Sequence, residues 1–319
     1  MTTLGLVGAG SHSRANHAAA LRYIKQNDPD SVRLAAVCDL SEQKARSCAD
    51  EFGFETTYTE IDQMLDSEEI DGLILVTPVE LTEQIAMRML PLGVPLVIEK
   101  PPGVDSAATR RIVQVAKETR TPHMVSLNRR FSPALVMANE WMAANAADRP
   151  PQVCIARMLR HSRTEPSFRV WTGIHLVDGA LSVMGRPSTV RATNTPSQHE
   201  GVFYTQAAVE TELGMVHYFL SPAVGVLEET YEFQGPDYTV QVDAQQCALR
   251  IFDARECVVE WEADQDKPPA WLNGTVGETQ AFINAIEGRL EFGPTLEDAL
   301  RSVLTAEAMT FDGEITIAD

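Results

Sequence analysis

The stretch TLGLVGAGSHSRANHAAALRYIKQNDPDSVRLAAVCD, from Thr3 to Asp39, decides the fold of this chain. It begins with a short apolar run at residues 3–7 that enters a glycine-rich turn. Residues 14–24 then place alanine and leucine near helical spacing, and residues 32–38 form a second apolar, β-branched run. Strand, turn, helix and strand in this order are typical of a parallel α/β sheet.

The same alternation continues to about residue 127. Strand-like runs lie at 54–58, 70–76, 94–98 and 123–127, and helical patterns lie at 42–52, 59–65, 82–90 and 106–119. Ser41 and Gly53 are suitable caps for the helix between them. Repeated units of this kind bind ligands at the carboxyl ends of their strands. We therefore expect residues 1–122 to form a domain that binds a ligand at the first turn.

The second half of the sequence changes character. Strand-like runs follow one another at 153–159, 189–193, 202–209, 215–220, 226–233, 238–242 and 258–261. A helix is expected at 174–184, and two closing helices are expected at 277–286 and 295–308. Strands that follow strands favour an antiparallel sheet. We predict a second α/β domain, residues 123–319, with an open, mainly antiparallel sheet.

Composition excludes several classes of partner. The 319 residues carry 45 Asp plus Glu against 26 Lys plus Arg, a net charge of −19, which disfavours nucleic acid and anionic membranes. No apolar run reaches the roughly 18 residues that would span a bilayer, and no secretory leader is visible. The five cysteines have neither disulfide nor zinc spacing. We expect a cytoplasmic protein with free thiols and no metal.

The first turn has the pattern G-x-G-x-x-S, formed by Gly8, Gly10, Ser11, His12 and Ser13. The first glycine permits a tight turn, and the second lets the backbone approach a pyrophosphate, which then faces amides at the helix N-terminus. Ser13 departs from the third glycine. A generic glycine turn is the alternative interpretation. The strand before it and the helix after it favour dinucleotide binding.

Asp39 ends the second strand, where a carboxylate can accept hydrogen bonds from the adenosine ribose. It would repel a 2′-phosphate, so NAD is favoured as the cofactor. Arg14 and Lys44 lie near Asp39 or the turn in sequence, and their positive charges leave NADP as an alternative cofactor.

Two further motifs carry side chains suited to proton transfer. Glu99-Lys100-Pro101 follows the fifth strand, where a lysine can polarise or protonate a substrate oxygen. His175 lies in the first turn of the helix expected at 174–184, with Asp178 one turn further on, and histidine exchanges protons near neutral pH. A surface lysine and a helix-packing histidine are the alternatives.

In this order, Gly8-x-Gly10, Glu99-Lys100-Pro101 and Gly173-x-His175-x-x-Asp178 resemble the glucose–fructose oxidoreductase, inositol dehydrogenase and MocA family. Further landmarks are Thr77-Pro78, Asn128-Arg129-Arg130-Phe131 and residues 295–299. The resemblance implies a Rossmann domain, a second domain whose sheet face builds a homodimer or homotetramer, and hydride transfer between nicotinamide and a sugar-like or cyclitol-like alcohol or ketone. It places Thr77, Pro78, Glu99 and Lys100 beside the cofactor.

One departure weakens the inference of ordinary dehydrogenase chemistry. Typical members have an aspartate four residues before the histidine, and this chain has Trp171 there. Without that acid, proton transfer must rest on Lys100, His175 or water. The alternative function is a dinucleotide-binding sensor or regulator that keeps the fold without the chemistry.

An arginine-rich stretch precedes the histidine. It consists of Arg157, Arg160, His161, Arg163 and Arg169. Arginine binds carboxylate or phosphate through a planar fork, so Arg160 and Arg163 are candidates for binding an anionic substrate together with Lys100, Trp171 and His175. The alternative is a solvated strand and loop whose arginines pair with neighbouring acids.

Overall fold

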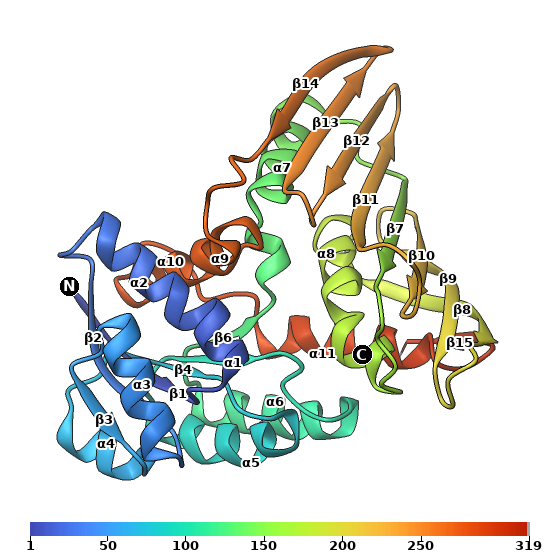
Figure 1. The fold of residues 1–319 in the computed structure, drawn as a ribbon. Helices are drawn as coiled ribbons and strands as arrows, with labels where there is room; N and C mark the ends of the chain where they lie inside the picture. The colour runs from blue at the N-terminus through green and yellow to red at the C-terminus, as the bar shows by residue number, and fades with distance from the viewer. Residues whose placement is uncertain (318–319) are drawn as a thin grey trace. The chain divides into compact units, whose positions relative to one another are not determined.

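The structure is a computed structural model and describes residues 1–317. The chain divides into two compact units, each with its own sheet (Figure 1). The N-terminal unit combines residues 1–127 with residues 268–299. The C-terminal unit combines residues 128–267 with the described residues from 300 onward.

The N-terminal unit contains a parallel six-stranded sheet in the order β3-β2-β1-β4-β5-β6. This is the order of a doubly wound Rossmann sheet, with the switch point between β1 and β4. The central strands are buried on both faces, which explains their continuous apolar sequences. The strands are β1 (Thr2–Val7), β2 (Val32–Cys38), β3 (Thr56–Tyr58), β4 (Gly72–Leu75), β5 (Leu96–Glu99) and β6 (His123–Ser126).

One continuous helical segment follows β1. It consists of α1 (Ser11–Ser13), a π-helical turn η1 (Arg14–Ala18) and α2 (Ala19–Asn27). The apolar periodicity of residues 14–24 predicted a regular α-helix, and the structure differs from this prediction by the wider π turn at its start.

The other helices of this sheet lie close to their predicted positions. They are α3 (Glu42–Phe52), α4 (Ile61–Ser67), α5 (Val79–Met89) with the 3₁₀ turn η2 (Leu90–Leu92), and α6 (Ser106–Thr119). The predicted caps of α3 are confirmed: the Ser41 hydroxyl accepts from the Lys44 amide, and Gly53 is left-handed with φ +86°.

A late segment of the chain returns to the N-terminal unit. It contains α9 (Pro269–Leu272) and α10 (Thr275–Ile286), and α10 lies beside α2 (Figure 1). Phe282 is fully buried, and a Cβ at Gly72 would lie only 2.9 Å from its ring. The Ser126 hydroxyl donates to buried Glu278 at 2.8 Å. The structural division thus differs from a single boundary after residue 122, because β6 pairs with β5 and α10 packs against this sheet.

The C-terminal unit contains a nine-stranded sheet in the order β14-β13-β12-β11-β7-β10-β9-β8-β15. Among the described strands of this sheet only the β7–β10 pair is parallel, so the predicted mainly antiparallel sheet is confirmed. The strands are β7 (Val153–Leu159), β8 (Pro187–Pro196), β9 (Phe203–Thr211), β10 (Met215–Ser221), β11 (Glu228–Gly235), β12 (Tyr238–Asp243), β13 (Ala248–Asp253), β14 (Glu256–Glu262) and β15 (Gly313–Thr316). The sequence patterns did not predict β13 or the edge strand β15.

Helix α8 (Ile174–Met184) has its predicted bounds and covers one face of this sheet. The hydroxyl of buried Tyr218 donates to the Val177 carbonyl at 3.2 Å, and that of buried Tyr231 donates to the His175 carbonyl at 3.2 Å. The remaining helical elements are the 3₁₀ turn η3 (Asn128–Phe131), the unpredicted α7 (Pro133–Asn145), the π turn η4 (Phe168–Thr172) and α11 (Leu296–Ala308), which runs on from the N-terminal unit.

Within residues 1–317, no helix has both the length and the apolar character needed to cross a membrane. All five cysteines are free thiols, as predicted.

Candidate functional site

Gly8 forms the turn at the carboxyl end of β1. Its amide donates to the Cys38 carbonyl at 2.7 Å, and its φ is +97°. A Cβ built on Gly8 would overlap the Val76 carbonyl oxygen. The turn therefore excludes any side chain at this position, because the backbone is left-handed and wedged between the ends of β2 and β4.

Gly10 opens the helical segment 11–27 and faces free space. A Cβ there would meet no heavy atom within 4 Å, so a ligand can approach the Gly10 backbone directly. Ser11 and His12 are exposed beside it, while Ser13 is buried and its hydroxyl donates to the Gly8 carbonyl at 2.6 Å. The buried Ser13 hydroxyl thus stabilises the turn through this hydrogen bond. The open side of Gly10 can receive a pyrophosphate.

Asp39 stands half-buried at the end of β2. One carboxylate oxygen accepts from the Ala9 amide at 2.8 Å, and the other accepts from the Ser41 amide at 2.9 Å. These bonds fix the carboxylate beside the turn, and each oxygen keeps lone pairs for ribose hydroxyls. The Arg14 guanidinium is paired with Glu51, so it is already engaged by an acid.

Thr77 and Pro78 follow β4 and border the same sheet edge. The Thr77 hydroxyl lies 3.0 Å from that of buried Thr82, which in turn donates to the Pro78 carbonyl at 3.2 Å. These contacts hold the connection into α5. The turn, Asp39 and this connection follow β1, β2 and β4, and their free space and acceptors fit a dinucleotide.

Glu99 ends β5 and is only 7% exposed. One of its oxygens lies 2.8 Å from Nε2 of buried His17 and 3.4 Å from Nε2 of His12. Burial opposes the charged form, but hydrogen bonds and charge from the two histidines outweigh it and hold the pKa of Glu99 well below its usual range. Glu99 is thus engaged inside the N-terminal unit, and His17 is a member of this site that the sequence did not indicate.

Lys100 is half-buried directly after Glu99, and its bond to Pro101 is cis. The strand places it at the edge of the sheet that also carries the glycine turn. This is the position at which α/β sheets hold reacting ligands.

Trp171 and His175 lie on either side of Gly173 in the C-terminal unit. Trp171 belongs to the π turn η4, and His175 lies in the first turn of α8; both are half-buried. A Cβ at Gly173 would overlap the Arg169 carbonyl oxygen. Glycine is required here because η4 runs directly into α8 at close contact.

Asp178 is a residue of α8, and its side chain is buried, with 1% exposure. It accepts two hydrogen bonds from Arg130, at 2.8 and 2.7 Å, and a third from Ser302 at 2.9 Å. These contacts make it an anchor for the helix.

A second buried carboxylate lies on β11. Glu229 is fully buried and accepts from Arg129 at 2.6 and 3.1 Å and also from Arg160. Burial opposes its charge, but the two guanidinium groups outweigh burial and lower the pKa of Glu229. The Arg160 guanidinium donates to two backbone carbonyls as well, so its described partners are all internal.

The other arginines of the 157–169 stretch have separate partners. Arg157 pairs with Glu228 at 3.2 Å, and Arg163 donates to Glu165 at 2.6 Å. Arg169 donates to Asn194 at 2.8 Å, and burial lowers its pKa. The structure therefore spreads these cations over several acceptors instead of bringing them together on one anion site.

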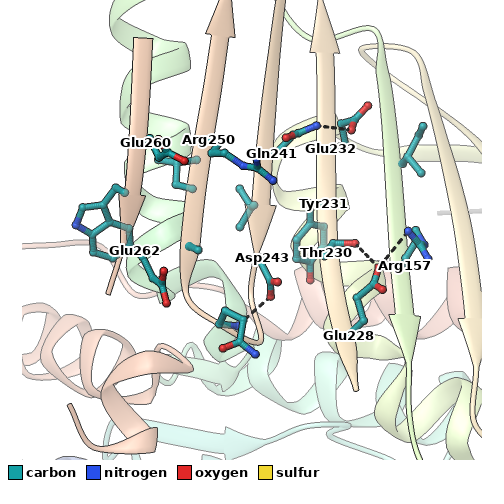
Figure 2. A pocket seen from close by; sticks show the side chains of 16 residues that line it. Arg157, Glu228, Thr230, Tyr231, Glu232, Gln241, Asp243, Arg250, Glu260 and Glu262 are labelled. Carbon is teal, nitrogen blue, oxygen red and sulfur yellow. Dashed lines mark hydrogen bonds and ion pairs between the residues drawn. The ribbon is translucent and has the colours of Figure 1, made fainter. Parts of the chain in front are cut away.

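A wide hollow lies on the face of the C-terminal sheet opposite α8 (Figure 2). Most of its lining residues on β11 alternate with buried residues of the opposite face; Tyr231, whose hydroxyl reaches α8, is an exception. The labelled side chains are Arg157, Glu228, Thr230, Tyr231, Glu232, Gln241, Asp243, Arg250, Glu260 and Glu262. Trp171 and His175 do not line it.

Residues 2–127 match the model of a family described as an oxidoreductase family with an NAD-binding Rossmann fold. The chain is 25% identical to inositol 2-dehydrogenase of Rhizobium meliloti, over 95% of this chain and 94% of that protein. It is 24% identical to the rhizopine catabolism protein MocA of Rhizobium meliloti, over 96% and 93% of the two chains.

Solved structures share the fold over the whole chain. A dehydrogenase from Chromobacterium violaceum superposes with a TM-score of 0.85 at 16% identity, over 97% of this chain and 94% of that one. Levoglucosan dehydrogenase in complex with NADH superposes with a TM-score of 0.82 at 16% identity, over 99% of each chain. With their glycine turn and parallel six-stranded sheet, residues 2–127 match this family of NAD-binding oxidoreductases, and the whole chain is similar to inositol 2-dehydrogenase and MocA.

Proposed function

We propose that this protein is an NAD-dependent dehydrogenase of a sugar-like or cyclitol-like alcohol. The observation that carries the proposal is the shared sheet edge in the N-terminal unit, where the open glycine turn, Asp39 and Lys100 follow β1, β2 and β5. The relatives named inositol 2-dehydrogenase and levoglucosan dehydrogenase support the substrate class.

Gly8, Gly10, Ser11 and His12 would hold the pyrophosphate, and Ser13 would keep their turn in place. Asp39 would accept from the adenosine ribose, while Thr77, Pro78 and Glu99 would border the nicotinamide end. The engagement of Arg14 by Glu51 favours NAD over NADP, because a 2′-phosphate would have to compete with that acid. Bound NAD supplies the hydride acceptor.

Lys100 and His175 are the residues that we assign to proton transfer. Lys100 would polarise the reacting oxygen through its ammonium, and His175 would take up the proton. Trp171 supplies no carboxylate, so it would contact substrate through its ring and its one N–H donor. The four arginines of the 157–169 stretch have partners inside the C-terminal unit, which favours an uncharged polyol over an anionic substrate.

The test is reduction of NAD⁺ by a panel of cyclitols and sugars, including sugar acids, followed at 340 nm. We expect saturable turnover with at least one neutral polyol, and a loss of about 10²–10⁴-fold in kcat for Lys100→Ala, the range of acid–base catalysis. Full activity of Lys100→Ala would contradict its role. Cofactor binding without turnover on the whole panel would favour a sensor.

We also propose that the protein is cytoplasmic and forms a homodimer or homotetramer. The uncovered face of the C-terminal sheet supports association, because it carries the partly exposed apolar side chains Phe219 and Val258 beside charges of both signs. Light scattering should give the mass of two or four chains. A monomer at micromolar concentration would contradict the assembly.

A further inference from the structure

Three side chains of the N-terminal unit converge on one point from two elements. His12 and His17 come from the helical segment after β1, and Glu99 comes from the end of β5. Their ligand atoms, two imidazole nitrogens and a carboxylate oxygen, all lie within 4.8 Å of one another. Two imidazoles and one carboxylate are a donor set that suits zinc and its neighbours in the first transition series.

The π turn makes this convergence possible. His12 and His17 are five residues apart, a spacing that places side chains on different sides of a regular α-helix. In a π turn the backbone bonds link residues five apart, so the wider turn η1 between His12 and His17 brings their side chains closer to one side of the segment. Because η1 spans Arg14–Ala18, both Nε2 atoms point to the same oxygen of Glu99. No metal site is predicted from the sequence because this turn is not visible in it.

The distances are close to those that a tetrahedral ion requires. Bonds of about 2.0–2.1 Å place neighbouring ligand atoms about 3.3 Å apart. The His12–Glu99 separation is 3.4 Å and already fits, whereas the His17–Glu99 separation is 2.8 Å and must widen by about half an ångström. The two imidazole nitrogens lie within 4.8 Å of each other and can reach this spacing by a small rotation of the exposed His12 side chain.

Burial and charge favour binding at this point. His17 and Glu99 are fixed in the interior, whereas the His12 side chain is 53% exposed and offers a path from solvent. The Asn16 amide nitrogen lies 3.4 Å from Nδ1 of His12 and donates to the His12 carbonyl at 3.1 Å, which helps to hold this residue in place. The net charge of −19 raises the local concentration of cations around the chain.

We propose that His12, His17 and Glu99 form a binding site for one divalent transition-metal ion of the zinc class, with a fourth coordination position open toward solvent. The ion would replace the imidazole N–H protons that face Glu99 in the metal-free protein. His12 and Glu99 also border the proposed cofactor site, so the ion is tested in the absence of cofactor, and its binding can be measured whether or not the protein is a dehydrogenase.

The experiment is titration of the tag-free, full-length protein with Zn²⁺ in competition with a chromophoric chelator, in the absence of cofactor and substrate. We expect one ion per chain and at least a tenfold weaker affinity for His12→Ala. His199→Ala is the matched control, because His199 is an exposed histidine of the other unit, and it should bind as the unaltered protein does. Urea unfolding of His12→Ala should match that of the unaltered protein, which excludes misfolding.

Two further measurements decide the geometry and the chemical class. Co²⁺ should give the intense visible absorption of a low-coordinate complex, absent in His12→Ala, and Mg²⁺ should not compete. Zinc binding that is the same in His12→Ala and His199→Ala, or no binding at 100 μM free zinc, would overturn the proposal and leave the three residues as a hydrogen-bonded cluster. These experiments measure metal binding and absorption spectra, so their results do not depend on whether a substrate of the protein is found.

Discussion

At the scale of single residues, the two glycines of the first turn are required for different reasons. Gly8 is left-handed, and its Cα faces the Val76 carbonyl, so a side chain would disturb the protein itself. Gly10 has ordinary extended angles and free space around its Cα, so a side chain there would disturb only a ligand. The sequence motif does not distinguish the two glycines. In the structure, Gly8 is required for folding and Gly10 for access of a ligand.

Matched alanine substitutions test this distinction. Gly8→Ala should lower the free energy of unfolding by roughly 1–3 kcal/mol, through left-handed strain and overlap, and should also weaken NADH binding. Gly10→Ala should leave unfolding unchanged within about 0.5 kcal/mol while weakening NADH binding at least tenfold. Urea denaturation and NADH fluorescence titration measure the two effects. Equal loss of stability in both variants would contradict the assignment.

Glu229 provides a second test at this scale, because it compensates two arginines in the interior. Glu229→Gln should cost about 3–5 kcal/mol of unfolding free energy, the cost of leaving buried charge unpaired. Glu228→Gln, which touches the partly exposed Arg157, should cost at most about 1 kcal/mol. Urea denaturation at pH 7 compares them, and equal effects would show that Arg129 and Arg160 do not depend on Glu229.

The pH dependence of this difference has a defined sign. The folded pKa of Glu229 is lowered, so its stabilisation is present above the unfolded value of about 4.3 and is lost as pH falls through the folded value. The gap in stability between the unaltered protein and Glu229→Gln should therefore be constant from pH 6 to 8 and shrink below about pH 4. A gap that widened in acid would contradict this.

At the scale of elements, both candidate regions contain a π turn. The turn η1 precedes α2 and carries His17, and η4 precedes α8 and carries Trp171. Such turns interrupt helices at functional sites because they turn side chains away from regular α spacing. In η4 the backbone passes so close to Gly173 that only glycine fits.

The close contact at η4 leads to a prediction about stability. Gly173→Ala should lower the free energy of unfolding by about 1–3 kcal/mol, the usual cost of forcing an extra methyl group into a packed site. Gly225→Ala is the control, since a Cβ there would meet nothing within 4 Å. Chemical denaturation of the two variants side by side checks this. Unchanged stability of Gly173→Ala would show that η4 can open without cost.

At the scale of the whole molecule, the N-terminal unit is assembled from two distant parts of the chain. Residues 268–299 return to the Rossmann sheet, where buried Phe282 and half-buried Ile286 fill the space left by Gly72. Buried Glu278 adds a hydrogen bond from Ser126. The packing around the Rossmann sheet is therefore incomplete without residues 268–299, which follow most of the second unit in sequence.

This division predicts the behaviour of fragments. Residues 1–127 alone should unfold with low cooperativity and bind a hydrophobic dye, because the surface under α10 is uncovered. The same fragment joined through a flexible linker to residues 268–299 should unfold cooperatively. Circular dichroism during thermal unfolding measures both, and a cooperative transition in residues 1–127 alone would contradict the prediction.

The sequence alone determined those features that depend on local order. Alternating apolar runs and caps predicted the Rossmann sheet, the bounds of β2, α6, β7 and α8, and the glycine turn, because burial periodicity and turn chemistry act over a few residues. The cofactor class followed from the turn and Asp39.

Only the tertiary structure decided which distant residues meet. The return of residues 268–299, the pairing of each arginine in the 157–169 stretch and the meeting of Glu99 with two histidines depend on contacts across the sheet and on a π turn. Except for Arg163, which pairs with nearby Glu165, these partners are separated by tens to hundreds of residues, so their contacts leave no periodic trace in the sequence. The predicted roles of Lys100 and His175 rest on family resemblance, since each lies in a different unit.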